Sequence, residues 1–284
     1  MLKRLATMGL SLPIDITVSE SNARRPSQRV CAHVFSNPFP EGCFAKVDEG
    51  LYVSTPEHCF YQLASELPLI KAVELGFELC GAYTLPNAKA AKENASSHDK
   101  GFQNRPPLTT RRELLAFNSK MAGLPGQKQA LRPLAYILDG SESPMETILT
   151  MLLVLPCKLG GYGLPEPELN SKIRPMGLAR QSASKSSYRC DLFWPEEYVV
   201  VEYDSDMFHT GSERISQDAR KRNTLTTISL CVITVTSRQV FNVFEFEKVA
   251  KMLAINLGVR LRHKECLIFP EARRDLREFL LPSS

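Results

Sequence analysis

The chain has 284 residues, 43% of them hydrophobic and 23% charged, which is the composition of a folded globular protein with one large or two modest domains. Its formal net charge of +4 is only mildly basic, so the overall charge does not by itself indicate a nucleic-acid-binding protein. This composition excludes a disordered, collagen-like or disulfide-scaffold chain.

Residues 1–140 are predicted to form a smaller α+β accessory domain. Strands are expected at 14–18, 29–35, 43–47 and 51–54, followed by helices from 55, at 68–79, at 109–122 and at 127–138. Pro56 suits the first turn of a helix, and Ser54 or Thr55 can cap it. No pattern in this part indicates catalysis, so we expect it to position a substrate or bind a partner.

Residues 141–284 are predicted to form a second domain. A helix at 144–155, with Ser143 as its cap, precedes two strands at 188–194 and 198–204. A helix at 216–227, a buried strand at 229–236 and helices at 243–257 and 271–281 complete the order. The order predicts an α/β fold, with a mixed central sheet flanked by helices.

Acidic residues interrupt the two apolar strands of this domain. Asp191, Glu202 and Asp204 are of types that strands disfavour and that are seldom buried without a partner. If the hairpin turns at Glu196 and Glu197, Asp191 lies opposite Glu202, with Cβ atoms about 5 Å apart. Alternation then predicts one apolar face and one acidic face.

Two facing carboxylates repel each other unless a cation lies between them, so the pattern predicts a metal site. Oxygen ligands from Asp191 and Glu202 suit Mg²⁺ or Mn²⁺ better than zinc. His209 follows the second strand and is a candidate ligand or proton carrier. The alternative is an acidic hairpin whose charges simply face water.

Basic residues cluster in sequence near these acids. Between Asn170 and Asp191 there are several basic residues and no acidic one, and three more, Arg220, Lys221 and Arg222, follow Asp218. Such segments suit a polyanionic substrate, since they hold phosphates while carboxylates hold the metal. The candidate nucleic-acid-binding residues are Lys172, Arg174, Arg180, Lys185, Arg189, Lys221 and Arg222. The alternative is a set of solvated basic loops.

The ordered segments SPMET, GLPEPELN, RCDLFWP, VEYDSDMFH and D-x-x-K-R-x-x-L resemble the PD-(D/E)XK nuclease superfamily, and most closely its branch similar to very-short-patch-repair endonucleases. The resemblance covers about residues 141–261. It implies a restriction-endonuclease-like core, in which a helix carrying a Glu precedes a mixed sheet. An Asp on the second strand and a Glu or Asp on the third then bind Mg²⁺.

Carried over by position, Glu146 matches the helix acid, while Asp191 and Glu202 match the metal ligands. His209 and Asp218 match polar residues of the short-patch-repair-like branch. Asp204 occupies the position of the superfamily lysine, which leaves the water-positioning role unassigned. Lys221, one helical turn beyond Asp218, is a candidate substitute cation.

The first part more weakly resembles AbiEi-type antitoxin and regulator proteins, through the segment GLYVSTPEHCFYQLA. The N-terminus is too short for the winged helix-turn-helix of those proteins, so that DNA-reading role is not carried over.

The leading prediction is a divalent-metal-dependent DNA endonuclease. The alternatives are an inactive nuclease-fold regulator that binds DNA or a cognate toxin in a toxin–antitoxin or phage-defence system, and a nuclease that cuts RNA.

The cellular compartment is predicted from the cysteines and the start of the chain. The eight cysteines contain no C-x-x-C pair, and no zinc-binding spacing is evident. The N-terminal apolar run is broken by Ser11, Pro13 and Asp15, so it makes a poor signal peptide, and no stretch is long enough to span a bilayer. We therefore expect a cytoplasmic protein without membrane contact.

Overall fold

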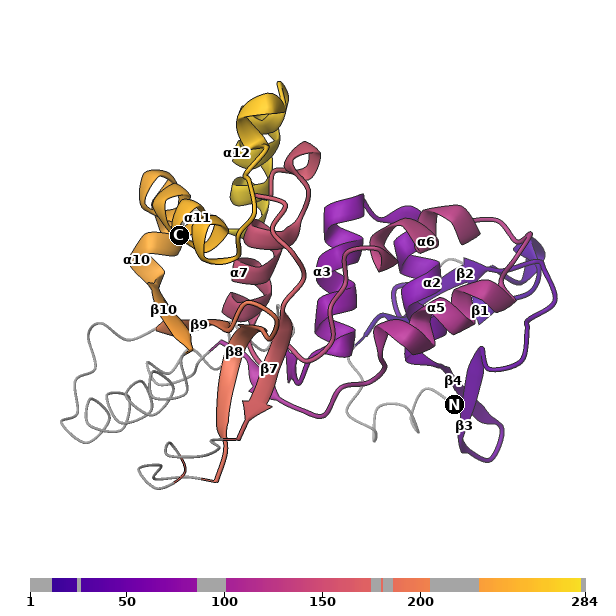
Figure 1. Ribbon diagram of the computed structural model, residues 1–284. Coiled ribbons are helices and arrows are strands. Elements are labelled where there is room, and N and C mark those ends of the chain that lie inside the picture. The colour runs from indigo at the N-terminus through magenta and orange to yellow at the C-terminus, as the bar shows by residue number, and fades with distance from the viewer. Residues whose placement is uncertain are drawn as a thin grey trace.

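A computed structural model describes residues 12–24, 27–85, 101–174, 180, 186–204 and 230–281. It is a mixed α/β structure of helices with small sheets (Figure 1). The predictions for His209, Asp218, Lys185, Lys221, Arg222 and the helix at 216–227 concern residues outside these ranges. Among the described helices, none is both long and apolar enough to cross a membrane.

The N-terminal part contains short strand pairs and a group of helices. The strands are β1 (Ile14–Val18), β2 (Val30–Val34), β3 (Phe44–Asp48), β4 (Leu51–Ser54), β5 (Tyr83–Thr84) and β6 (Gln103–Asn104). The helices are α2 (Pro56–Glu66), α3 (Leu69–Cys80), α5 (Arg111–Lys120) and α6 (Gln127–Leu134). Thr55 caps α2 by accepting the His58 N–H, which confirms the predicted start of that helix.

The C-terminal part contains a four-stranded mixed sheet in the order β10-β9-β8-β7. Its strands are β7 (Glu168–Ile173), β8 (Tyr188–Trp194), β9 (Val199–Asp204) and β10 (Cys231–Thr236). The helices around it are α7 (Pro144–Val154), α10 (Ser237–Phe241), α11 (Val243–Asn256) and α12 (Phe269–Leu280). β9 runs parallel to β10, whereas β8 is antiparallel to both β7 and β9. The predicted mixed sheet is therefore present, and β7 is a strand that the sequence pattern missed.

One large buried cluster runs through both parts of the chain. It includes Phe60 and Leu134 from the first group of helices, and Leu152 and Trp194 from α7 and β8. The Tyr83 hydroxyl lies 2.9 Å from the Thr147 hydroxyl, across the predicted boundary at residue 140. The division into two domains at that residue stays a prediction.

Apolar side chains pack on both faces of the sheet. Val199 and Val201 belong to the large cluster, while the intervening Val200 is fully buried in a second cluster with Tyr188 and Cys190. A strand buried on both faces is a continuous apolar run, which explains the sequence Val199-Val200-Val201. The prediction of one apolar and one acidic face was therefore wrong, since the face opposite the large cluster is also apolar.

Candidate metal centre

The β8–β9 hairpin has the pairing that the turn at Glu196 and Glu197 predicts. Trp194 faces Val199, and Leu192 faces Val201. The turn covers residues 195–198, and Tyr198 has a positive φ of 57°, so β9 begins at Val199 rather than at the predicted Tyr198. The regular pairing ends at Leu192 and Val201, one residue before Asp191 and Glu202.

Asp191 departs from regular strand geometry. Its Oδ2 accepts the backbone N–H of Tyr203 at 2.8 Å, so the carboxylate replaces a backbone acceptor beside β9. Strict alternation is also interrupted there, because Cys190 packs in the smaller cluster while Leu192 packs in the larger one. The hydrogen bond thereby fixes the Asp191 carboxylate beside Tyr203, the neighbour of Glu202 in β9.

The two candidate ligands are both partly buried. In the parallel pairing with β10, Glu202 lies level with Thr234, and the Glu202 Oε1 atom is buried. Asp204 is exposed at the end of β9, level with Thr236. The structure therefore separates the three acids by environment: Asp191 and Glu202 lie within the sheet, and Asp204 lies at its rim.

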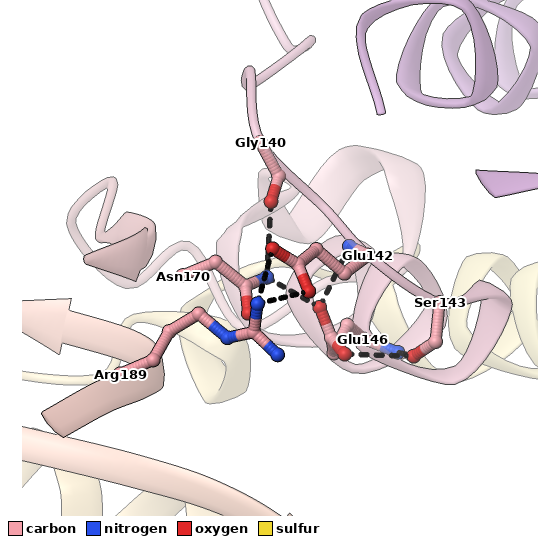
Figure 2. Close-up of polar contacts among 6 residues, drawn as sticks. All are labelled: Gly140, Glu142, Ser143, Glu146, Asn170 and Arg189. Atoms are coloured by element: carbon pink, nitrogen blue, oxygen red, sulfur yellow. Dashed lines mark hydrogen bonds and ion pairs between the residues drawn. The ribbon is translucent and has the colours of Figure 1, made fainter. Parts of the chain in front are cut away.

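Glu146 holds the start of α7 against β7 (Figure 2). Its Oε1 accepts the Ser143 hydroxyl at 2.9 Å, and its Oε2 accepts the Glu142 N–H at 2.9 Å. The Asn170 side-chain amide donates to the same Oε2 at 2.6 Å and to the Gly140 carbonyl at 2.9 Å. Both carboxylate oxygens therefore already accept hydrogen bonds.

The charge of Asp191 acts on Glu146. Burial raises the pKa of the Glu146 carboxyl, and the nearby Asp191 carboxylate raises it further. The hydrogen bonds from the Glu142 N–H, Asn170 and Ser143 oppose this shift of the pKa. The negative charge of Asp191 and burial therefore act in the same direction on the pKa of Glu146.

Asn170 is a residue of this site that the sequence reasoning missed. It occupies β7 with a positive φ of 50°, a conformation that Asn tolerates better than most residues. Its amide connects Glu146 to the Gly140 carbonyl, so it fixes the helix acid relative to the sheet. An Asn at the end of the segment GLPEPELN was the available signal, because strands disfavour that residue.

Two of the four described basic candidates, Lys172 and Arg189, lie on strands of the sheet. Lys172 of β7 pairs directly with Arg189 of β8, and both are exposed. Arg189 forms an ion pair with Glu142 at 2.6 Å, just before α7 (Figure 2). Arg174 and Arg180 are exposed as well. Two of the predicted phosphate-binding residues are therefore cross-strand neighbours, and one of these is partly neutralised.

The donor set fits a hard divalent cation. Mg²⁺ in proteins is commonly held by one or two carboxylates, with water or substrate phosphate in the remaining positions. Asp191 and Glu202 could supply those carboxylates. Within the described residues, neither of them belongs to a group of three or more Asp, Glu, His or Cys residues whose ligand atoms lie within 4.8 Å of one another.

Comparisons of the chain with protein-family models, with curated proteins and with solved structures gave no match.

Proposed function

We propose that the β7–β10 sheet and α7 form a restriction-endonuclease-like core that hydrolyses DNA phosphodiester bonds with a divalent metal ion. The observation that carries the proposal is the placement of the acids. In chain order, Glu146 is on the helix before the sheet, Asp191 is on its second strand, and Glu202 is on its third strand. The Asp191 carboxylate accepts the N–H of Tyr203, the neighbour of Glu202. This is the arrangement that the PD-(D/E)XK resemblance implies.

In this proposal the acidic residues have different roles, which follow from their different environments. Asp191 and Glu202 hold Mg²⁺ or Mn²⁺, which when bound lowers the pKa of water and stabilises negative charge on the phosphate. The Tyr203 N–H fixes the orientation of the Asp191 carboxylate. Glu146 anchors the start of α7 through Asn170, so it acts as a positioning residue.

Lys172 and Arg189 bind the phosphate backbone in this proposal. They are exposed neighbours on the sheet, and cationic side chains of this kind provide most of the sequence-independent affinity for DNA. Glu142, which pairs with Arg189, is displaced from it by a phosphate group.

The inactive-regulator alternative is favoured by a different observation. Asp204 stands at the usual lysine position, and both oxygens of Glu146 are engaged in hydrogen bonds within the protein. In that case the acids hold the hairpin and helix together, and the protein works by binding DNA or a partner such as a cognate toxin.

The deciding experiment is cleavage of supercoiled plasmid and of labelled single-stranded DNA with Mg²⁺, with Mn²⁺ and with chelator. The variants are Asp191→Asn and Glu202→Gln, and the matched control is Glu197→Gln, an exposed carboxylate in the turn of the same hairpin. Asn retains an acceptor for the Tyr203 N–H, so Asp191→Asn tests the charge rather than the fold.

We expect metal-dependent cutting by the wild type and by the Glu197 variant, with at least a hundredfold loss of rate in the other two. The nuclease proposal fails if the wild type does not cut while DNA or protein binding persists in all three variants. Binding that persists without cleavage would support the inactive-regulator alternative. A parallel assay on labelled RNA separates DNA from RNA as the substrate.

A further inference from the structure

A second group of metal-ligand side chains lies far from the carboxylate site in sequence, on the β1–β2 pair. Asp15 of β1 and Cys31 and His33 of β2 place one ligand atom each within 4.8 Å of one another. In the part of the chain that the structure describes, this is the only such group with three donor residues.

The strand register produces this grouping. Asp15 lies directly opposite Cys31, and Thr17 lies opposite His33, in a parallel pair. Residues two apart on a strand share a face, so Cys31 and His33 project on the same side as Asp15. The other face carries Ile14, Ile16, Val30 and Ala32, and Ala32 is buried.

The donors already interact without a metal ion. The His33 Nε2 lies 2.7 Å from the Asp15 Oδ1, and these side chains are 50% and 72% exposed respectively. Ligand atoms around tetrahedral zinc are about 3.3–3.8 Å apart, given metal–ligand bonds of about 2.0–2.3 Å. Small rotations of exposed side chains would convert the existing group into that geometry.

Within the described residues, the strand pair is only partly covered by the rest of the protein. Parallel sheets are ordinarily covered on both faces, and parallel pairing is slightly weaker per residue than antiparallel pairing. β1 and β2 form a two-stranded sheet, and most of the residues in them are exposed or only partly buried. A metal ion bound by residues of both strands would add a link that holds β1 against β2.

We propose that Asp15, Cys31 and His33 bind a Zn²⁺ ion that links β1 to β2, with the fourth position taken by water or an external ligand. The thiolate and imidazole favour Zn²⁺ over Mg²⁺, so this site differs in metal preference from the all-oxygen pair of Asp191 and Glu202. On binding, the Cys31 thiol loses its proton and His33 coordinates as neutral imidazole.

The experiment is equilibrium dialysis of the full chain against Zn²⁺ in excess Mg²⁺, with metal content measured by mass spectrometry. Co²⁺ is titrated in parallel, because a thiolate ligand gives cobalt a near-ultraviolet charge-transfer band. The variants are Cys31→Ser and His33→Gln, and the matched control is Cys266→Ser, a partly buried thiol outside the group. Circular dichroism of the metal-free proteins shows whether each variant is folded.

The wild type and the Cys266 variant should bind one equivalent of Zn²⁺ that Mg²⁺ does not displace, with a cobalt–thiolate band. Each ligand variant should bind at least tenfold more weakly, and the band should be lost in Cys31→Ser. Hydrogen exchange in β1 and β2 should slow with Zn²⁺ in the wild type and in the Cys266 variant, but not in the two ligand variants. Equal zinc affinity in the wild type and both ligand variants, or no zinc binding by the folded wild type, would overturn the proposal.

Discussion

Trp194 is the side chain whose removal should most clearly test the packing of the β8–β9 hairpin. It is 2% exposed in the large cluster, and its indole Nε1–H donates to the Pro165 carbonyl at 2.9 Å. Trp194→Ala removes that packing, which typically costs about 3–5 kcal/mol in a core. The Pro165 carbonyl then also loses its donor, which adds about 1–3 kcal/mol if it stays buried.

We therefore expect Trp194→Ala to lower the free energy of unfolding by about 4 kcal/mol or more. With a urea slope of about 3 kcal/mol per molar, the unfolding midpoint would fall by more than about 1 M. Far-UV circular dichroism is the suitable probe, because Trp194 is the only tryptophan and its fluorescence disappears with the substitution. Trp194→Phe keeps an aromatic ring but removes the donor, so it should fall between Ala and wild type.

Tyr198→Ala is the matched control, since Tyr198 lies in the same hairpin and is 60% exposed. An exposed substitution of this kind changes stability by about 0.5 kcal/mol or less. The reasoning is refuted if Trp194→Ala and Tyr198→Ala lower the urea midpoint by similar small amounts. Such a result would mean that Trp194 is not held in the core.

Other substitutions test other parts of the structure. The pKa of Glu146 is raised above its ordinary 4.5, so its contribution to stability is present at low pH and is lost as the pH rises through the raised value. The free energy of unfolding, measured in urea from pH 4 upward, should therefore fall more steeply with pH for the wild type than for Glu146→Gln. Parallel plots of this free energy against pH for the two proteins would contradict the reasoning. Gly160 has a φ of 89°, and an added Cβ would lie 2.3 Å from the Ala272 carbonyl oxygen. Gly160→Ala should thus cost more than about 2 kcal/mol, measured by thermal unfolding, because the steric overlap adds to the left-handed strain. Gly258→Ala, with a φ of 64° and no atom within 4 Å of the added Cβ, should lose only about 1–2 kcal/mol, and equal effects at the two glycines would be the contrary result.

Asp191→Ala combines two opposing effects. The substitution relieves repulsion with Glu146, but it removes the acceptor of the Tyr203 N–H, a loss of about 1–2 kcal/mol. The lost hydrogen bond leads us to expect a small net loss of stability, while Asp191→Asn should remain closer to wild type in urea unfolding.

Local patterns were sufficient to predict most helices and strands. The β-branched and aromatic runs of β8 and β9 are strands, and Ser143 caps α7 as its position before Pro144 predicts. The hairpin register also followed from the sequence, because the turn length fixes which residues face each other. β7 was missed, since its sequence ELNSKI is mostly polar and lacks the apolar run of a central strand.

The sequence determined the elements and the pairing of neighbours across a short turn, because those depend on residues close together in the chain. Only the tertiary structure decided which distant residues meet. Asn170 reaches Glu146, Lys172 lies beside Arg189, and Asp15 joins the two donors on β2. The two cross-strand contacts depend on sheet order and strand register, and the contact of Asn170 with Glu146 depends on how α7 packs on the sheet. A one-residue change of register would place these side chains on opposite faces, and no local signal in the sequence sets that register between distant strands.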